Sequence, residues 1–487
     1  MENKCKYKSI FEYNTKQTEY FYNSTDFEVL AKNITVKNAV KKSDEKIGLA
    51  EIAEVDLVRH FTNLSRDVYG VDNGIYPLGS CTMKYNPKIT EKIAALPEFN
   101  NVHPYAEIEE MQGFLKVMFE LEGMLSEISG MDAVTLQPCA GAHGEFTGLL
   151  IIDKYHKSRG DFGRKKVIIP DTAHGTNPAS SSMVGMEVVQ IKTDEAGNID
   201  LAVLENAVDE NTAAFMLTNP STLGFFEKNI LKIAEIVHKK GALLYYDGAN
   251  LNPMLGIARP GDMGFDVLHI NTHKTFATPH GGGGAGSGPV GVKAFLKDFL
   301  PHPRIKFKGE TGEYILDVKN ENSIGRVRSY FGNFQVLLKT YIYILMLGAE
   351  GLKNTGEISI LNANYLLSKV KEIFNYPFGD KKCMHEFVIS CQNYKSEGIK
   401  ALDIAKRMID YGIHPPTIYF PLIVHEAMMF EPTETENKQS IDDLVEILRK
   451  IKNEIMNEPE KVKNSPLTKK VGRLDDVKAV KEPRLVY

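Results

Sequence analysis

The sequence predicts an α/β protein: a large domain built on a doubly wound, mostly parallel sheet, followed by a smaller C-terminal α/β domain. Two observations predict this fold. Short, continuously apolar segments such as AVTL (133–136) and AAFML (213–217) alternate with longer segments of helical periodicity. Strands buried on both faces have this composition, and the alternation of strands with helices is typical of parallel sheets.

The predicted elements follow one another along the chain. Expected strands lie at 133–136, 167–169, 188–191, 213–217, 242–246 and 267–270. Expected helices, from the spacing of apolar residues, lie at 49–70, 108–128, 141–155, 201–208 and 230–239. Residues 320–352 are expected to be mainly helical. The smaller domain is expected to hold strands at 387–390 and 417–421 and helices at 398–410 and 440–456.

The domain boundaries follow from changes in composition. Residues 1–75 form an N-terminal arm and a helix, because the first 45 or so are polar and only weakly periodic. The large domain takes residues 76–330 and opens with the turn-rich YPLGSCTMKYNP (76–87). The smaller domain takes residues 331–460, and residues 461–487 form a charged tail.

Composition excludes several classes of protein. The net charge is −5 and the basic clusters are short, which argues against a nucleic-acid partner. Five scattered cysteines without a C-x-x-C spacing disfavour a disulfide framework or a metal site and suit a reducing cytosol. No signal peptide or membrane-spanning stretch is predicted. We therefore expect a cytoplasmic protein without metal or membrane contact.

A lysine beside an unusual run of glycines is the first candidate for chemistry. Lys274 follows the apolar strand DVLHIN (266–271) and precedes Gly281–Gly284. An unpaired charge at the end of a buried strand is costly, and four successive glycines give up packing. Backbone that passes close to a charged ligand explains both features, whereas a flexible surface loop is the alternative.

The position of Asp247 leads to a specific hypothesis for the role of Lys274. Asp247 ends the strand that precedes the Lys274 strand, so both side chains are expected at the same edge of the parallel sheet. A Schiff-base lysine and a carboxylate for the pyridinium nitrogen are what proteins contribute to pyridoxal phosphate chemistry. A lone aspartate at a strand end is usually a helix cap, so the pair carries the prediction.

A phosphate site is expected at the loop Ala140, Gly141 and Ala142, which opens a helix. Exposed N–H groups and the helix dipole favour an anion there. The loop lacks a Walker lysine, which makes a nucleotide less suitable. His273 and Thr275 are expected to close the other side of the phosphate, although a plain strand-to-helix turn has a similar sequence.

Two further polar residues follow strands of the same sheet. His174 is expected to stack on a pyridine ring, with a general acid or base role as the second choice and a structural hydrogen bond as the alternative. Asn219 is expected to bind the phenolic oxygen of the cofactor. A turn-forming Asn-Pro is the competing interpretation.

Several segments together resemble one known family, the P-protein of the glycine cleavage system. They cover most of residues 70–440: YPLGSCTMKYNP (76–87), LQPCAGAHGEFTGL (136–149), AHGTNPAS (173–180), TNPSTLGFFE (218–227), YDGANLNPMLG (246–256), DVLHINTHKTFATPHGGGGAGSGPVGV (266–292) and FPLIVHEAMMFEPTETE (420–436). The P-protein is either one long chain or two subunits. This chain resembles the C-terminal half, subunit 2, which carries the lysine.

The resemblance implies fold type I of the pyridoxal-phosphate enzymes, with a seven-stranded sheet. It implies catalytic roles for Lys274, Asp247 and His174, with pyridoxal 5′-phosphate as cofactor. The implied reaction is decarboxylation of glycine and transfer of the aminomethyl group to the lipoyl arm of the H-protein. The implied partners are the lipoylated H-protein and subunit 1, in an α2β2 heterotetramer.

Alternatives remain at this stage. The chain has no strand–GxGxxG–helix signature for a nicotinamide cofactor. Another fold-type-I enzyme, such as an aminotransferase or an amino-acid decarboxylase, is the second reading, and a non-catalytic scaffold subunit is the third. Arg326 and Arg328 are candidates to anchor the glycine carboxylate, with a surface role as the alternative.

Overall fold

The computed structural model describes residues 9–12, 50 and 52–483, which fall into two units. The first unit combines the two ends of the chain, Met1–Asn73 and Ser465–Tyr487. Its described part contains the helices η1 (Ile10–Glu12), α2 (Glu54–Asp67) and α15 (Asp476–Lys481). An ion pair between Lys470 and Asp67, at 2.6 Å, joins its two segments. Most of the arm predicted over residues 1–45 lies outside the described residues.

The second unit, Gly74–Asn464, is built on a seven-stranded sheet. The strand order is β1-β7-β6-β5-β4-β2-β3, and only β7 runs antiparallel to its neighbours. The sheet therefore has the mostly parallel arrangement that the alternating pattern predicts. The strands are β1 (Ala133–Thr135), β2 (Lys166–Pro170), β3 (Glu187–Ile191), β4 (Thr212–Thr218), β5 (Leu243–Gly248), β6 (Val267–Ile270) and β7 (Val290–Val292).

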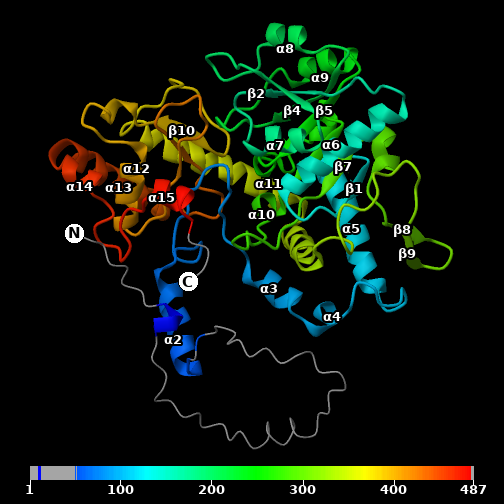
Figure 1. Ribbon diagram of the computed structural model, residues 1–487, viewed down its shortest axis with the longest axis horizontal. Coiled ribbons are helices and arrows are strands. Elements are labelled where there is room, and N and C mark those ends of the chain that lie inside the picture. Colours follow the sequence, from blue (N-terminus) through cyan, green and yellow to red (C-terminus); the bar gives the residue numbers. More distant parts are fainter. Residues whose placement is uncertain (1–8, 13–49, 51, 484–487) are drawn as a thin grey trace, which may run out of the picture. The chain divides into compact units, whose positions relative to one another are not determined.

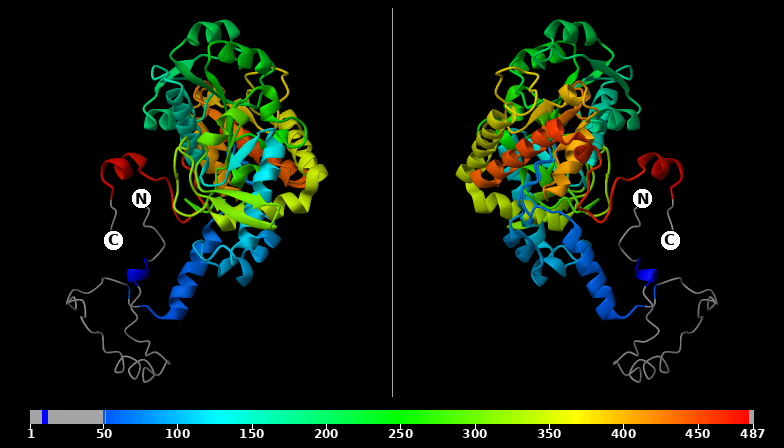
Figure 2. Two further views of the ribbon diagram at one scale, coloured as in Figure 1. Left: turned by 90° about the vertical axis from the view of Figure 1, so that its right-hand side faces the viewer. Right: turned by 90° about the vertical axis from the view of Figure 1, so that its left-hand side faces the viewer.

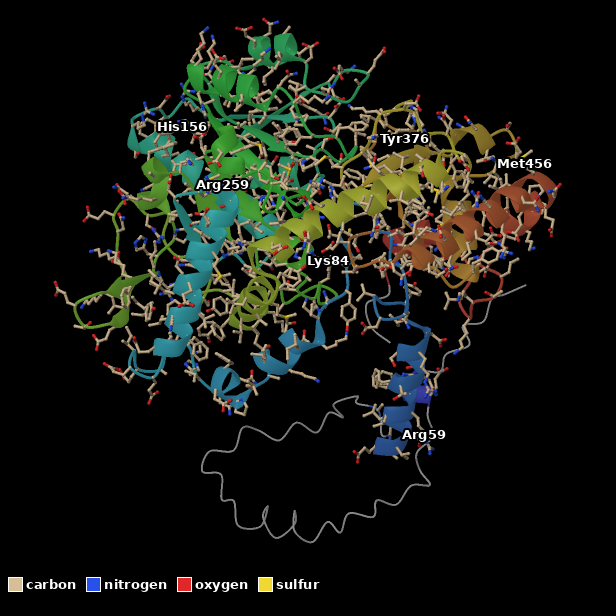
Figure 3. All side chains as sticks on the ribbon, turned by 180° about the vertical axis from the view of Figure 1, so that it is seen from behind. Arg59, Lys84, His156, Arg259, Tyr376 and Met456 are labelled. Carbon is tan, nitrogen blue, oxygen red and sulfur yellow. The ribbon has the colours of Figure 1, made fainter. Side chains whose placement is uncertain are left out.

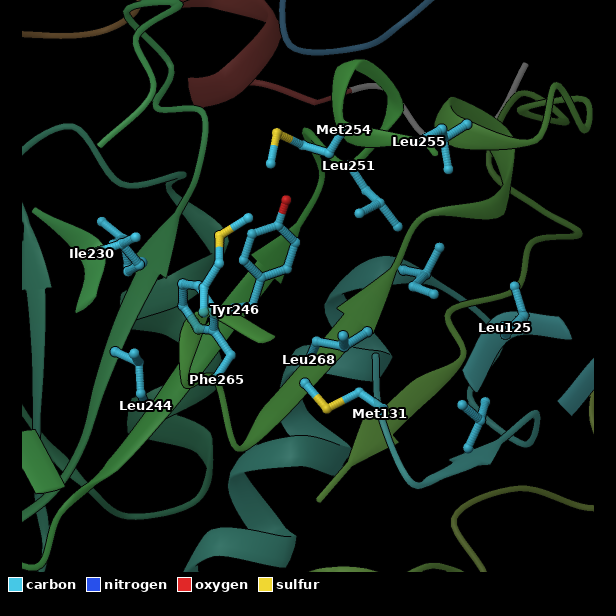
Figure 4. Close-up of a cluster of buried hydrophobic side chains, with 14 of the residues drawn as sticks. Leu125, Met131, Ile230, Leu244, Tyr246, Leu251, Met254, Leu255, Phe265 and Leu268 are labelled. Carbon is cyan, nitrogen blue, oxygen red and sulfur yellow. The ribbon is translucent and has the colours of Figure 1, made fainter. Parts of the chain in front are cut away.

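Helices cover both faces of this sheet, as Figure 1 and the side views of Figure 2 show. Alternate residues of β4 point to opposite faces: Phe215 joins the core beneath α5, α8 and α9, whereas Met216 joins the core beneath α6. Figure 4 shows part of the first core around Tyr246 and Leu268. The helices are α5 (Gln112–Ser129), α6 (Gly141–Ser158), α7 (Thr176–Met183), α8 (Leu201–Ala207) and α9 (Ile230–Lys239).

A second, antiparallel sheet has the order β10-β12-β11. It consists of β10 (Phe387–Ser390), β11 (Thr417–Ile418) and β12 (Ala427–Phe430), and it shares a core with α12 (Ala401–Asp410) and α13 (Lys438–Asn457). The sequence predicts β10 and both helices. It extends β11 too far, to 421, because Tyr419 leaves the strand with φ of 59° and Pro421 lacks the N–H of a strand residue. It does not predict β12.

The long helix α11 (Phe334–Val370) connects the two cores. Its backbone is non-helical at Gly348, where φ is 60° and ψ is −174°. The helix expected over 320–352 is wrong before Phe334, because Gly325 and Gly332 adopt positive φ in turns there. The sequence also misses the hairpin of β8 (Arg304–Lys308) and β9 (Glu313–Asp317).

Short helices complete the second unit, and none of the described helices is both long and apolar enough to span a membrane. The turn-rich stretch predicted at 76–87 has no helix within it and leads into α3. The short helices are α3 (Lys88–Ala94), α4 (Pro97–Asn100), η2 (Asn252–Met254), η3 (Pro260–Met263), α10 (Thr272–Thr275), η4 (Ala294–Phe299), η5 (Gln392–Tyr394) and α14 (Pro459–Lys463).

Candidate active site

A cavity of about 430 Å³ lies at the carboxyl ends of the parallel strands. Cavities of this size hold small ligands and cofactors, and this edge of the sheet is where open α/β folds bind them. Parallel pairing places Asp247 of β5 opposite His269 of β6, which brings Asp247 close to the helix α10 that follows. Six residues singled out from the sequence line the cavity: Gly141, Ala142, His174, Asp247, His273 and Lys274.

Asp247 is almost fully buried, and both of its carboxylate oxygens have partners. Its Oδ2 accepts hydrogen bonds from Asn177 at 3.0 Å and from His174 Nδ1 at 2.9 Å, while Oδ1 accepts the Ala249 N–H at 3.0 Å. His269 Nε2 lies 3.2 Å from Oδ1. Burial alone would raise the pKa of Asp247, but the two imidazoles outweigh it and hold that pKa well below its ordinary range.

The imidazole of His174 is held at both nitrogens. Nδ1 faces Asp247, and Nε2 lies 2.5 Å from the hydroxyl oxygen of Ser80. Because Asp247 is an ionised acceptor, Nδ1 carries a proton, and Nε2 accepts the Ser80 hydroxyl when Nε2 itself is unprotonated. The ring of Phe420 lies nearly parallel to that of His174, with centroids 6.2 Å apart. Both rings border the cavity as flat faces.

Lys274 is partly buried at the cavity wall, and its amine has no ion-pair partner within the described part of the chain. The imidazoles of His273 and His280 pack edge to face near it, with centroids 4.6 Å apart. Burial, together with the positive charge of Lys274, lowers the pKa of His273 to about 3 and that of His280 to about 4. Both rings are therefore neutral near pH 7, and Lys274 is the cation among them.

The helix α6 directs its N-terminus at the cavity. Gly141 and Ala142 line the wall, and no side chain caps the helix at Ala140. The first N–H groups of such a helix are free to bind an anion. A Cβ at Gly141 would lie 1.9 Å from Asn271 Oδ1, so this turn requires glycine.

Five residues predicted for the site do not line the cavity. Asn219 is buried, and its Oδ1 accepts the Glu227 N–H at 2.9 Å. Thr275 is buried, and its carbonyl accepts Lys84 Nζ at 2.9 Å. The other three lie outside the lining as well: Ala140, Arg326 and Arg328.

The four successive glycines have a conformational reason in the structure. Gly281–Gly284 are exposed, and their φ values run from 59° to 142°, a region that favours glycine. A Cβ would collide only at Gly281, with the carbonyl of Gly284 at 1.9 Å. The close backbone approach occurs instead at Gly288, where a Cβ would lie 2.0 Å from the Ala140 carbonyl. Passage of the run close to a cofactor stays a prediction.

Sequence reasoning missed the residues that close the cavity from the other side. Ser80 and Cys81 come from the turn-rich segment 76–87, whose sequence predicts no catalytic or binding role for them. Thr417 and Phe420 come from the smaller sheet and the turn after it. The turn-rich sequence of 76–87 is a signal for Ser80 and Cys81, because irregular segments of this kind often carry functional residues.

Two buried glutamates lie behind this segment. Glu386 and Glu431 are fully buried, and His385 Nε2 lies 3.9 Å from a carboxylate oxygen of each. Burial raises the pKa of Glu431 to about 7. Burial and the charge of Glu431 raise the pKa of Glu386 well above its usual range, and burial lowers that of His385 to about 3. Sequence reasoning gave these residues no role.

Comparison with known proteins decides the family. The chain is 59% identical over 439 residues to a probable glycine dehydrogenase (decarboxylating) subunit 2 of Kosmotoga olearia, covering 90% of each chain. It is 58% identical to the probable subunit 2 of Thermotoga maritima, covering 89% of this chain and 91% of that one. The chain belongs to the glycine dehydrogenase (decarboxylating) subunit 2 family. This confirms the resemblance on which the sequence prediction rested.

Family models agree with that membership. One described as "Glycine dehydrogenase, C-terminal domain" matches residues 355–471, and one described as "Aminotransferase class-V" matches residues 151–286. The first covers most of the smaller sheet and its helices. The second covers the strands and helices that carry His174, Asp247 and Lys274.

Solved structures show the fold. A glycine decarboxylase (P-protein) of the glycine cleavage system has a TM-score of 0.71 at 20% identity, covering 85% of this chain and 92% of that one. A NifS-like protein has a TM-score of 0.61 at 14% identity, covering 78% and 99%. Fold type I of the pyridoxal-phosphate enzymes, with a seven-stranded sheet, is thereby confirmed.

The residues of the cavity fit the cofactor of this fold, pyridoxal 5′-phosphate. A free lysine amine suits its aldehyde, and a carboxylate held ionised suits its ring nitrogen. An uncapped helix N-terminus suits its phosphate. The orphaned buried Oδ1 of Asn271, beside Gly141, is a further polar atom at that end of the cavity.

Proposed function

We propose that this chain is the lysine-bearing subunit of a two-subunit enzyme that decarboxylates glycine. The aminomethyl group is transferred to the lipoyl arm of the H-protein, with release of CO2 and reduction of the lipoyl disulfide. The observation that carries the proposal is one cavity that gathers Lys274, Asp247, His174 and the N-terminus of α6, in a chain of this family.

Pyridoxal phosphate, when bound, supplies an electron-accepting ring for the carbanion left by decarboxylation. Lys274 is the residue that holds its aldehyde carbon, because it is the lysine amine that lines the cavity. Asp247 holds a proton on the ring nitrogen. Its depressed pKa keeps the carboxylate negative at neutral pH, which is the state that stabilises a protonated pyridine.

His174 presents a flat ring to the cofactor, and its contact with Asp247 fixes that ring at Nδ1. The N-terminus of α6 binds the phosphate through Gly141 and Ala142, and His273 closes the cavity beside Lys274.

The domain limits are part of the proposal. The large cofactor-binding domain takes residues 76–330 and the smaller domain residues 331–460, because the seven-stranded and three-stranded sheets fall on opposite sides of this boundary. Residues 1–75 form the N-terminal arm and helix, and residues 461–487 form the tail. We place the protein in the cytoplasm, in line with its scattered free cysteines.

The designation of the relatives as subunit 2 supports a partner, subunit 1, in an α2β2 heterotetramer. The isolated chain is expected to bind pyridoxal phosphate but to release CO2 from glycine only with subunit 1 and the lipoylated H-protein present. The assay is the release of labelled CO2 from carboxyl-labelled glycine. Full activity of the purified chain alone would contradict the two-subunit proposal.

The visible absorption spectrum tests the cofactor directly. Apoprotein titrated with pyridoxal phosphate is expected to develop the band of the lysine-bound cofactor, and Lys274→Ala is expected to lack it. Lys157→Ala is the matched control, because Lys157 lies on the surface of α6 and pairs with Asp153 at 2.6 Å. An unchanged band in Lys274→Ala would refute the assignment. Efficient keto-acid production from bulkier amino acids would favour an aminotransferase instead.

A further inference from the structure

One residue, Ser80, joins the two halves of the cavity through its hydroxyl and its backbone N–H. Ser80 Oγ lies 2.5 Å from Nε2 of His174, a residue of the large sheet edge, while the Ser80 N–H donates to Glu386 Oε2 at 2.6 Å. Glu386 belongs to the turn before β10 of the smaller sheet. Ser80 therefore connects the ring that faces the cofactor with a fully buried carboxyl group of the other core.

The backbone around Ser80 is held in an unfavourable conformation. Ser80 has φ of 62° and Thr82 has φ of 48°, and non-glycine residues rarely adopt such values. Strain of this kind persists where surrounding contacts over-determine it, and it is concentrated at functional sites. The contacts at 79–82 therefore have to be strong.

Those contacts are buried and specific. Glu431 accepts the Thr82 N–H at 3.0 Å and the Thr82 hydroxyl at 2.6 Å. The Gly79 N–H donates to the Met429 carbonyl at 3.2 Å, and a Cβ at Gly79 would lie 2.2 Å from the Met429 side chain. Glu386 and Glu431 thus hold the backbone on either side of Cys81, at Ser80 and at Thr82.

We propose that Ser80 is a positioning residue that fixes the imidazole of His174, and that Glu386 and Glu431 hold Ser80 in place by binding the backbone of residues 80–82. The inference rests on the proposed function, since His174 matters only if its ring faces the cofactor. With Nδ1 bound to Asp247 and Nε2 bound to Ser80, the ring cannot rotate about its axis without losing both partners.

Two substitutions at Ser80 separate the effect of its hydroxyl from the effect of its backbone strain. Ser80→Ala and Ser80→Gly both remove the hydroxyl, but alanine keeps the backbone strain of serine at φ of 62° whereas glycine relieves it. If the hydroxyl is what matters, both variants share one defect at the cofactor. If backbone strain matters, Ser80→Gly behaves like the wild type or better.

The measurements are the dissociation constant of pyridoxal phosphate from apoprotein and the visible circular dichroism of the bound cofactor. Both variants are expected to bind it about tenfold more weakly, which corresponds to about 1.4 kcal/mol. The dichroic band is expected to shrink, because the ring of His174 no longer holds one orientation. Ser359→Ala is the control, since Ser359 is a buried hydroxyl that binds the Gly356 carbonyl on α11.

A double-mutant cycle with His174→Ala tests whether Ser80 affects cofactor binding through His174. Ser80→Ala is expected to have no further effect on cofactor binding once His174 is absent. Additive effects, or wild-type affinity in both Ser80 variants, would overturn the proposal. Absence of cofactor binding by the wild-type chain would instead overturn the proposed function, so the two failures are distinguishable.

Discussion

The buried ion pair of Lys84 and Glu434 is expected to be a large contributor to the stability of the second unit. Lys84 Nζ lies 2.8 Å from Glu434 Oε1 and donates to the Thr275 carbonyl at 2.9 Å and to the Tyr343 hydroxyl at 3.3 Å. Its side chain is 1% exposed. In Figure 3, Lys84 lies against α11, the helix that carries Tyr343.

Removing one partner leaves the other charge buried. Breaking a pair of this kind destabilises a protein by about 3–5 kcal/mol. We therefore expect Lys84→Met to lower the free energy of unfolding by about that amount. Lys84→Met combined with Glu434→Leu is expected to lose much less, because no uncompensated charge remains.

The ion pair is fully formed at neutral pH. Burial alone would lower the pKa of Lys84, but the carboxylate of Glu434 outweighs it and raises that pKa above its ordinary range. A lysine whose pKa is raised on folding contributes stability below its unfolded pKa and loses it only as the pH rises through the folded pKa. The contribution is thus complete at pH 7.

Urea denaturation is the assay, followed by far-ultraviolet circular dichroism because the chain contains no tryptophan. Lys232→Met, at an exposed position of α9, is the control for loss of a surface lysine. A loss below about 1 kcal/mol in Lys84→Met would refute the reasoning, since that is the range of exposed ion pairs.

Two further predictions follow from the buried carboxyl groups. Asp247→Asn is expected to retain the visible band of bound cofactor but to lose most turnover, because a neutral amide no longer holds the proton on the ring nitrogen. Unchanged turnover would refute that role. Glu431 has a pKa raised to about 7, so its burial opposes folding increasingly as the pH rises from about 4.5 through 7. In urea titrations, Glu431→Gln is expected to lose stability less steeply than the wild type between pH 5 and pH 8, and parallel pH profiles would contradict this.

Periodicity could predict the large sheet because its strands are short, apolar and regularly separated. β4 and β5 are buried along their whole length and read directly as strands. The same rule fails for β8 and β9, where charged residues interrupt or flank the apolar ones and only Ile305 is buried, so that no continuous apolar run marks these strands. It fails again at 320–333, where turns depend on single glycines rather than on a repeat.

The residues of the site also fall into those that the sequence predicts and those that it does not. Asp247, His174 and Lys274 follow strands of one parallel sheet, so topology alone predicts that they meet. Ser80 and Phe420 reach the cavity from segments that no sheet register connects to it. Their placement depends on packing between the two cores, which has no periodic signature in the sequence. Asn219 does not line the cavity, and its amide oxygen accepts the Glu227 N–H, so a contact of Asn219 with the cofactor stays a prediction.

The hydrogen bonds that hold residues 79–82 in place join distant parts of the chain: Thr82 and Glu431 are 349 residues apart in sequence. Contacts of such long range form late, because the entropy of closing the intervening loop must be overcome first. On the ribosome, Lys274 and Asp247 emerge well before Glu386 and Glu431 do. The wall of the cavity that contains Ser80 can therefore be completed only after almost the whole second unit has been synthesised.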